Sequence, residues 1–450
     1  HYLYHWARLK AEVKYEDVFK AVGEIDVPRG MVIGEKTQWV TASRDPLDEN
    51  KWWEVHPRQL YIEYLSPIGL FRLGQQTSQW GMGVLAGDGD HPTLFGDYRR
   101  GSLVERLLFA TRPMGKDTPL QVALAGDLVF EDARAKLIDG DRALQLVGVV
   151  RWQEPSWELG IYGVYRHQES DGESTGSLTP FTDKLNVGVV DLAGKFNAPI
   201  PGTRAHVFGQ FEAAFVGGAM SYVRNVDQTR AGNQEVVRNY GGAAVLGVAS
   251  TAGTGADRWG DCVVSLEWGY ASGDADPGDG VTKRFTMDPN HNVGLILFDQ
   301  VLAWKTARAA TIAQDRLIVN RPSPGLQFLP SEGGIFGATY LYPTVVVRPE
   351  RWVDVKGGIV LAETTADFVD PFQYGALGNY RNFEGGQAKV HELGAEFDLG
   401  VDFRIAIDPH VAVNVGTEGG VFVPGGAFDD GTGQRLPVQY LINNKLGVQF

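Results

Sequence analysis

Apolar and polar side chains alternate along most of this chain. In residues 8–15, Leu9, Ala11 and Val13 share one parity, and charged side chains occupy the other. A period of two residues with one apolar face predicts a β-strand whose two faces meet different surroundings. The alternation resumes after a short turn and continues to Val27, so this segment predicts a hairpin with one apolar and one charged side.

The same pattern recurs to the end of the chain. Further strands are predicted near 60–64, 71–73, 103–112, 120–130, 143–152, 158–168, 185–196, 205–216, 241–252, 261–272, 335–348, 353–365, 392–406, 411–423 and 437–450. Short turns alternate with long polar or glycine-rich segments, which is typical of outer-membrane barrels with periplasmic turns. The pattern favours an all-β fold, a transmembrane antiparallel up-and-down β-barrel, over a soluble sandwich with its charged faces in water.

With the opening hairpin, the predicted strands number seventeen, whereas bacterial single-chain barrels have an even number of strands. We expect about eighteen strands in the full barrel, with one N-terminal strand upstream of His1, and sixteen as the fallback. The chain is predicted to form a single outer-membrane β-barrel domain over residues 1–450. Its long loops are expected at 28–58, 77–102, 274–332 and 366–390.

The last predicted strand ends on an aromatic residue. Lys445, Gly447 and Phe450 follow a spacing that resembles the C-terminal assembly signal of bacterial outer-membrane β-barrels. The resemblance implies that the barrel assembly machinery recognises this strand. Such a strand needs a partner at both edges, because lipid offers its backbone groups no hydrogen bonds.

Three other stretches resemble the alginate-export family of outer-membrane porins. They are residues 71–76 (FRLGQQ), 267–274 (EWGYASGD) and 393–399 (LGAEFDL). The resemblance implies an eighteen-stranded barrel, although the first stretch has Gln where that family has Arg, so the likeness concerns the fold more than the cargo. Residues 79–86 and 94–101 are also similar to an uncharacterised family of predicted barrels from myxobacteria, which we take as the closer kin.

The composition agrees with a barrel and excludes several other classes. The chain is 43% hydrophobic with a mean hydropathy of -0.17, and no apolar run approaches the ~20 residues of a transmembrane helix. A net charge of -14 argues against a nucleic-acid partner. The single cysteine, Cys262, excludes a disulfide framework, and we expect neither a metal nor a cofactor.

Charged side chains on the polar parity are the candidate pore lining. The early strands supply mostly basic residues and the later strands supply acids: Arg8, Lys10, Lys14, Lys20, Glu63, Arg72, Arg106, Glu267, Glu396 and Asp398. Opposed basic and acidic walls would set up a transverse field that favours polar solutes. Cross-strand ion pairs that only fill the interior are the alternative.

Two long loops are candidates for narrowing the pore. Loop 77–102 is glycine-rich and ends on Arg99 and Arg100, which suits a constriction, with an external loop as the alternative. The Ala-rich stretch 301–316 has a helical period and is a candidate plug or cover for the mouth.

These features predict a passive channel of the bacterial outer membrane for polar or anionic solutes, saccharides among them. Outer-membrane lipid and lipopolysaccharide would surround it. The alternative is a plugged barrel that acts as a scaffold for other envelope proteins. An outer-membrane barrel enzyme is a minor alternative, because His206 and Ser265 both lie on the polar parity without any sign that they meet.

Overall fold

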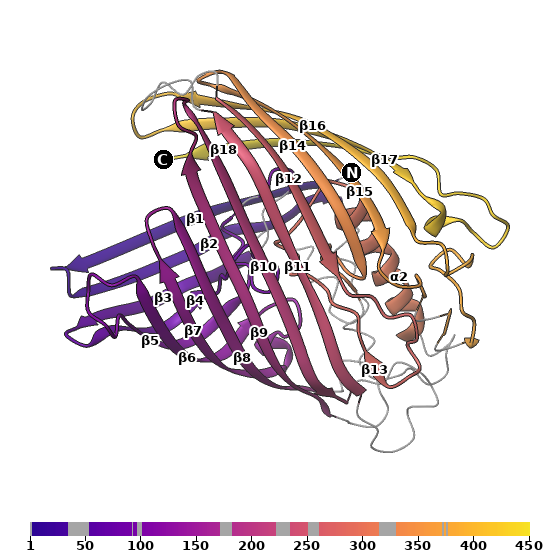
Figure 1. The fold of residues 1–450 in the computed structure, drawn as a ribbon, viewed down its shortest axis with the longest axis horizontal. Coiled ribbons are helices and arrows are strands. Elements are labelled where there is room, and N and C mark those ends of the chain that lie inside the picture. Colours follow the sequence, from indigo (N-terminus) through magenta and orange to yellow (C-terminus); the bar gives the residue numbers. More distant parts are fainter. Residues whose placement is uncertain are drawn as a thin grey trace.

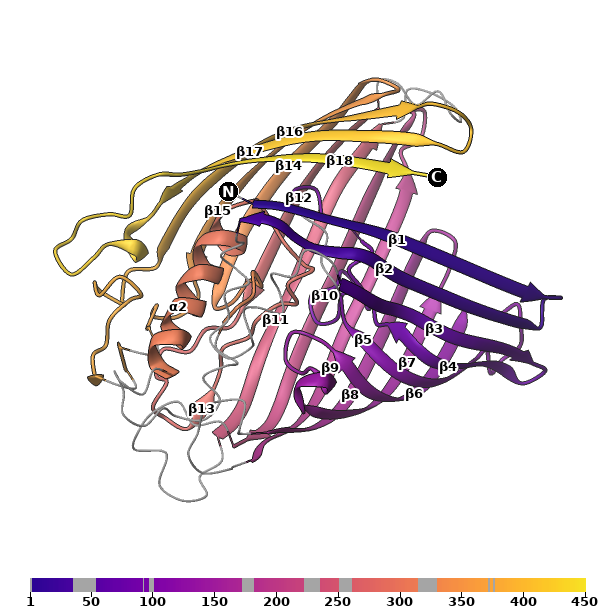
Figure 2. The ribbon, with the colours of Figure 1, turned by 180° about the vertical axis from the view of Figure 1, so that it is seen from behind.

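The strands of this chain form one eighteen-stranded sheet that curves into a barrel (Figures 1 and 2). The computed structural model describes residues 2–34, 54–91, 93–96, 101–171, 182–221, 235–250, 261–314, 330–370, 373–374 and 377–450. The first nine strands are β1 Tyr2–Tyr15, β2 Phe19–Gly34, β3 Glu54–Ser66, β4 Gly69–Thr77, β5 Leu103–Thr111, β6 Leu120–Glu131, β7 Arg142–Gln153, β8 Trp157–Asp171 and β9 Thr182–Pro199. The others are β10 Ala205–Met220, β11 Glu235–Ser250, β12 Cys262–Ala271, β13 Val281–Thr282, β14 Ala338–Glu350, β15 Val353–Thr364, β16 Glu392–Ala406, β17 Ala412–Pro424 and β18 Gln439–Gln449.

Consecutive long strands pair antiparallel, so the topology is up-and-down throughout. The two-residue strand β13 lies parallel to β11, and β12 pairs directly with β14. The predicted all-β barrel is confirmed. Its eighteen strands are the seventeen long strands expected from the sequence together with β13.

The predicted loop 28–58 is wrong at both ends. Strand β2 continues to Gly34 and strand β3 begins at Glu54. Polar residues extend these strands because they face the interior: Arg29 donates to Asp26 at 2.8 Å and Arg58 donates to Glu24 at 3.0 Å. Polarity therefore does not end a strand whose inner face carries its own ion pairs.

The outer face of the barrel is apolar along its length. On β7, Leu144, Leu146 and Val150 are exposed, whereas Ala143 and Val147 on the opposite parity are buried against the interior. A soluble sheet would hide the larger apolar face and expose the polar one. The inverted arrangement is that of a transmembrane barrel, whose apolar residues face lipid.

Aromatic side chains flank the short turns, as the sequence predicts. Trp152 and Trp157 stand on either side of the β7–β8 turn, and Trp352 lies in the β14–β15 turn, all exposed. Tryptophan favours the membrane–water interface, where its ring is half in lipid. Trp259, which was assigned to the same belt, lies outside the described residues.

The long connections carry the only α-helix among the described residues. Residues Leu297–Leu302 form one turn of π-helix that leads into α2, Ala303–Gln314. Figure 2 shows α2 within the outline of the barrel, at the end where the long loops lie. No helix in the described part of the chain is long and apolar enough to cross a membrane.

The sheet has one seam, where β1 and β18 face each other (Figures 1 and 2). Among the described residues, β1 pairs with β2 and β18 pairs with β17, and no pairing joins β1 to β18. The strand predicted upstream of His1 would belong at this seam, and it stays a prediction.

Candidate functional site in the barrel lumen

A loop between β4 and β5 folds into the lumen, and Glu212 on β10 holds its tip. We name residues 78–91 and 93–96 the inner loop. The Glu212 carboxylate accepts the backbone N–H groups of Met82, Val84 and Leu85 at 2.5, 3.1 and 3.0 Å. The tight turn requires glycine, because Gly81 and Gly83 have φ of 51° and 79° and a side chain at Gly81 would collide with Glu212.

Trp80 fixes the same end of the inner loop to the barrel wall. Its ring stacks on Tyr162 of β8 with centroids 5.3 Å apart, and its Nε1 donates to Asp191 of β9 at 3.0 Å. The tip is therefore bound to three adjacent strands, β8, β9 and β10.

The rest of the inner loop reaches the walls that flank the seam. Asp90 accepts from Arg8 of β1 at 2.5 Å and from Arg58 of β3 at 2.7 Å. Lys356 of β15 donates to the Leu94 carbonyl at 2.8 Å, and Glu418 of β17 accepts the Gly96 N–H at 3.2 Å. The inner loop thus crosses the lumen from one wall to the others.

A second segment, residues 283–314, also lies inside, and we name it the inner arm. Glu396 of β16 accepts the backbone N–H groups of Leu295, Ile296 and Leu297, the last two at 2.7 and 2.6 Å. These N–H groups begin the helical turn and have no partner within it, so a carboxylate is the natural acceptor. Glu212 and Glu396 are equivalent anchors, each holding one inner segment through three backbone donors.

The inner loop and the inner arm also bind each other. His291 Nδ1 lies 3.2 Å from the Met82 carbonyl, and its Nε2 lies 3.0 Å from the hydroxyl of Tyr340, which donates to Glu267 at 2.6 Å. Asp288 accepts the Gly87 N–H at 3.2 Å. Burial raises the pKa of Asp288 to about 6, because a carboxylate out of water loses its hydration.

Most of the predicted pore residues form a ladder of ion pairs across β1–β6. The N···O distances are 2.7 Å for Arg8–Asp26, 3.5 Å for Lys10–Glu24, 2.7 Å for Lys14–Glu12, 3.8 Å for Lys20–Glu63, 2.5 Å for Arg72–Glu63 and 2.7 Å for Arg106–Asp127. Their contacts are therefore those of the cross-strand alternative. Their role in conduction stays a prediction.

The remaining predicted site residues fall into three groups. Glu267 and Glu396 contact the inner arm as described above, and Asp398 lies two residues from Glu396 with no hydrogen-bond donor to either oxygen among the described residues. Arg99 and Arg100 lie outside the described residues. At the C-terminus, Lys445 donates to Glu418 at 2.8 Å, Gly447 pairs with Asn414 and Phe450 is exposed, and the assembly role of these three residues stays a prediction.

The minor enzyme alternative and the acidic loop sequences gain no chemistry from the contacts seen. The Ser265 hydroxyl lies 2.7 Å from that of Thr344, so it bonds to a threonine rather than to His206. Asp88 accepts the Asp90 N–H, and Asp90 binds two arginines. Within the described ranges, no group of three or more His, Cys, Asp or Glu residues is placed to hold a metal ion.

The principal residues that sequence reasoning missed are Trp80, Asp191 and Glu418, together with the anchoring role of Glu212. Parity places all three acids inside the barrel, so their orientation could have been inferred. Their partners could not, because they bind backbone N–H groups more than 100 residues away, and a backbone donor has no side-chain signature.

Comparison with known proteins gives the same architecture. No family model matches the chain, and no curated protein matches it. Among solved structures it is similar to OccAB1 of Acinetobacter baumannii, with 7% identity over 96% of this chain and 86% of that one and a TM-score of 0.49. It is also similar to OprD of Pseudomonas aeruginosa, with 10% identity, 99% and 91% coverage and a TM-score of 0.47.

A third similar structure is Wzi of Escherichia coli, a carbohydrate-binding β-barrel involved in group 1 capsule assembly. Its identity is 10%, its coverage 98% of this chain and 76% of that one, and its TM-score 0.44. Likenesses this distant assign no activity. The sheet itself is apolar outside and ion-paired inside, which is stable only with lipid around it, and the chain is therefore a porin-like β-barrel of the bacterial outer membrane.

Proposed function

We propose that this protein is a narrow channel for passive diffusion of small polar or anionic solutes across the outer membrane. The observation that supports this best is a cavity of about 280 Å³ inside the barrel, whose lining includes Arg134, Arg166 and Arg284. A solute-sized space with guanidinium groups suits anions, which arginine binds through paired N–H donors. The resemblance to alginate-export porins agrees with anionic cargo, and saccharide acids remain within the proposed class.

The inner loop and the inner arm are the proposed selectivity elements. They lie across the lumen on buried carboxylate anchors, so a solute must pass between them and the wall. Arg99 and Arg100 keep their predicted role as charges at the constriction. Lipopolysaccharide around the barrel and recognition by the barrel assembly machinery are further parts of the proposal.

A plugged scaffold is the rival function, and one observation favours it. The inner segments share an apolar cluster with the wall, in which Val84, Phe95, Leu297 and Phe298 are fully buried. Such packing closes part of the lumen to water.

Ion conductance in planar lipid bilayers separates the two functions. The protein should give small single-channel currents, and replacing residues 82–94 by a short Gly-Ser linker should raise the conductance several-fold because it opens the lumen. Replacing the surface turn 431–434 by the same residues is the control and should leave the conductance unchanged. Absence of any current from the unmodified protein at all voltages would refute the channel.

A further inference from the structure

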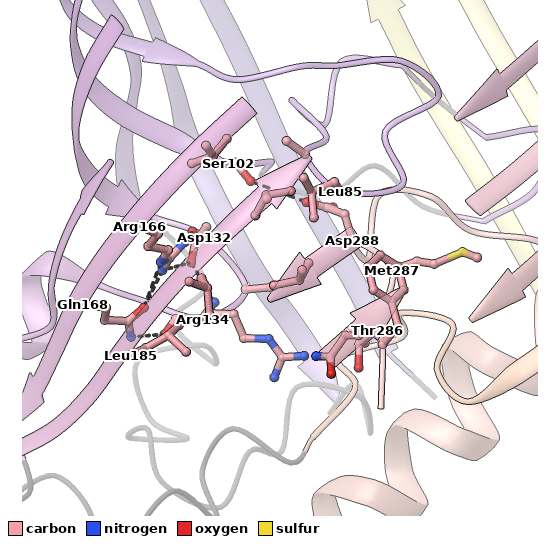
Figure 3. Close-up of a pocket in the computed structure, with 18 of the residues that line it drawn as sticks. Leu85, Ser102, Asp132, Arg134, Arg166, Gln168, Leu185, Thr286, Met287 and Asp288 are labelled. Carbon is pink, nitrogen blue, oxygen red and sulfur yellow. Dashed lines mark hydrogen bonds and ion pairs between the residues drawn. The ribbon is translucent and has the colours of Figure 1, made fainter. Parts of the chain in front are cut away.

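The cavity lies between the wall of β8–β11 and the two inner segments (Figure 3). Its volume of about 280 Å³ is close to the lower end of the ~300–1,000 Å³ range of small-molecule sites. Two kinds of surface meet in it, one apolar and one charged. An occupant must match both.

The apolar surface is a patch of the barrel wall. Its members are Val164, Val187, Val189, Val216, Met220 and Val237. They lie together because the register pairs Val164 with Val189 and Val189 with Val216. From the lumen side Leu85, Phe285 and Met287 close over the patch, so a polar molecule such as a sugar would leave its hydroxyl groups unpaired there.

The charged surface is built around Arg166. Its guanidinium donates to Asp132 at 2.5 Å and to Gln168 at 2.6 and 3.0 Å, which fixes its position. The turn that carries Asp132 also presents Arg134, which extends from this turn toward the Thr286 segment in Figure 3. Arg284, on the inner arm, stacks over Phe336 with its Cζ 4.0 Å from the ring centroid.

The acids of the lining are Asp132, Asp288 and Glu332. Asp132 is engaged by Arg166 and by the backbone N–H groups of Arg134 and Ala135. Asp288 is engaged by Gly87 and Asn290. The acids are therefore consumed in holding the site together, and the guanidinium groups set its preference.

One polar atom of the lining is left over. The side-chain oxygen of Asn239 on β11 is buried and has no hydrogen-bond donor among the described residues. Buried polar atoms in proteins almost always have a partner. A hydroxyl or amino group on an occupant would supply one.

We propose that this cavity binds a small organic carboxylate with an apolar body and a hydroxyl or amino group. The carboxylate would face the arginines, the apolar body the valine patch, and the donor Asn239. The proposal specifies the solute of the channel proposed above and rests on that function for transport, although binding itself requires no current.

Calorimetric titration of the detergent-solubilised full chain tests this. We expect 3-phenyllactate to bind at least tenfold more tightly than galacturonate, which lacks the apolar body, and than glucose, which lacks both features. The double variant Arg134→Gln and Arg284→Gln should weaken phenyllactate at least tenfold, because charge-assisted hydrogen bonds are lost. Val189→Thr, which keeps the volume, should weaken phenyllactate at least threefold.

The matched control is Arg112→Gln, an exposed arginine in the β5–β6 turn that bonds only to the Lys116 carbonyl. It should bind phenyllactate as the unmodified chain does, and heat-dependent gel mobility confirms folding of each variant. Equal affinity for galacturonate and phenyllactate, or unchanged binding in both pocket variants, would overturn the proposal. Current without selective binding refutes the pocket alone, and selective binding without current refutes the channel alone.

Discussion

Single carboxylates decide where the inner segments lie, and Glu212 is the clearest case. Three backbone N–H groups converge on it, and the side chain is fully buried. Hydrogen bonds to a charged acceptor contribute about 1.5–3 kcal/mol each. Glutamine keeps one acceptor oxygen but turns an NH₂ group toward the other donors.

Glu212→Gln should therefore release the tip of the inner loop. We expect hydrogen exchange of the Met82, Val84 and Leu85 amides to become at least tenfold faster, measured by mass spectrometry on the folded protein. Glu158→Gln is the control, because this interior-facing glutamate of β8 pairs with Lys195 at 3.4 Å and touches neither inner segment. Unchanged exchange at residues 82–85 in the Glu212 variant would show that Glu212 is not the anchor.

At the same scale, the sequence reveals orientation better than partnership. The parity of Arg8, Arg106 and Glu396 places all three inside the barrel. Arg8 and Arg106 then find acids on adjacent strands, as neighbouring strands in a meander require. Glu396 instead binds a helical turn 100 residues earlier, and no local pattern encodes that contact.

Among the elements, the joint between the inner loop and the inner arm is the part most sensitive to pH. Asp288 bridges them, and burial raises its pKa to about 6. Burial lowers the pKa of His291, but its hydrogen bond with Glu267 more than offsets this, so the net pKa is raised. Both groups bind protons more readily in the folded protein than in the unfolded chain, so their stabilisation is present at low pH and is lost as the pH rises through the folded pKa.

The joint should therefore loosen between pH 5 and pH 7.5, by roughly 1 kcal/mol for Asp288 alone. Protection of the Gly87 amide against hydrogen exchange, corrected for the intrinsic pH dependence of exchange, measures this. Asp288→Asn should reduce the pH dependence to the part contributed by His291. An identical pH profile in the variant and the unmodified protein would contradict the assignment to Asp288.

The strands themselves were predictable because each has one lipid face and therefore a strict period of two. Strand ends were less predictable, as the extension of β2 to Gly34 shows. The inner segments were hardest, since Trp80 and Phe298 are apolar residues in loops, and only the folded barrel provides the surface on which they pack.

For the whole molecule, the seam between β1 and β18 is the open question of the sheet. An odd number of antiparallel long strands makes the first and last run in the same direction, so they cannot form one more antiparallel pair. The exposed backbone edges would need a partner in lipid. The further strand predicted from the sequence would fill this place.

The apolar outer face makes the last prediction, which concerns the membrane itself. Leu399 lies in the middle of β16 and is 63% exposed, whereas Ile407 in the following short turn is 66% exposed. A lysine facing the bilayer midplane destabilises a barrel by about 2–4 kcal/mol, but one near the interface by about 0–1 kcal/mol. Leu399→Lys should lower the free energy of unfolding in lipid vesicles accordingly, measured by guanidinium titration, while Ile407→Lys should change it little. Equal effects of two substitutions at equally exposed leucine and isoleucine side chains would mean that water, and not lipid, surrounds this face.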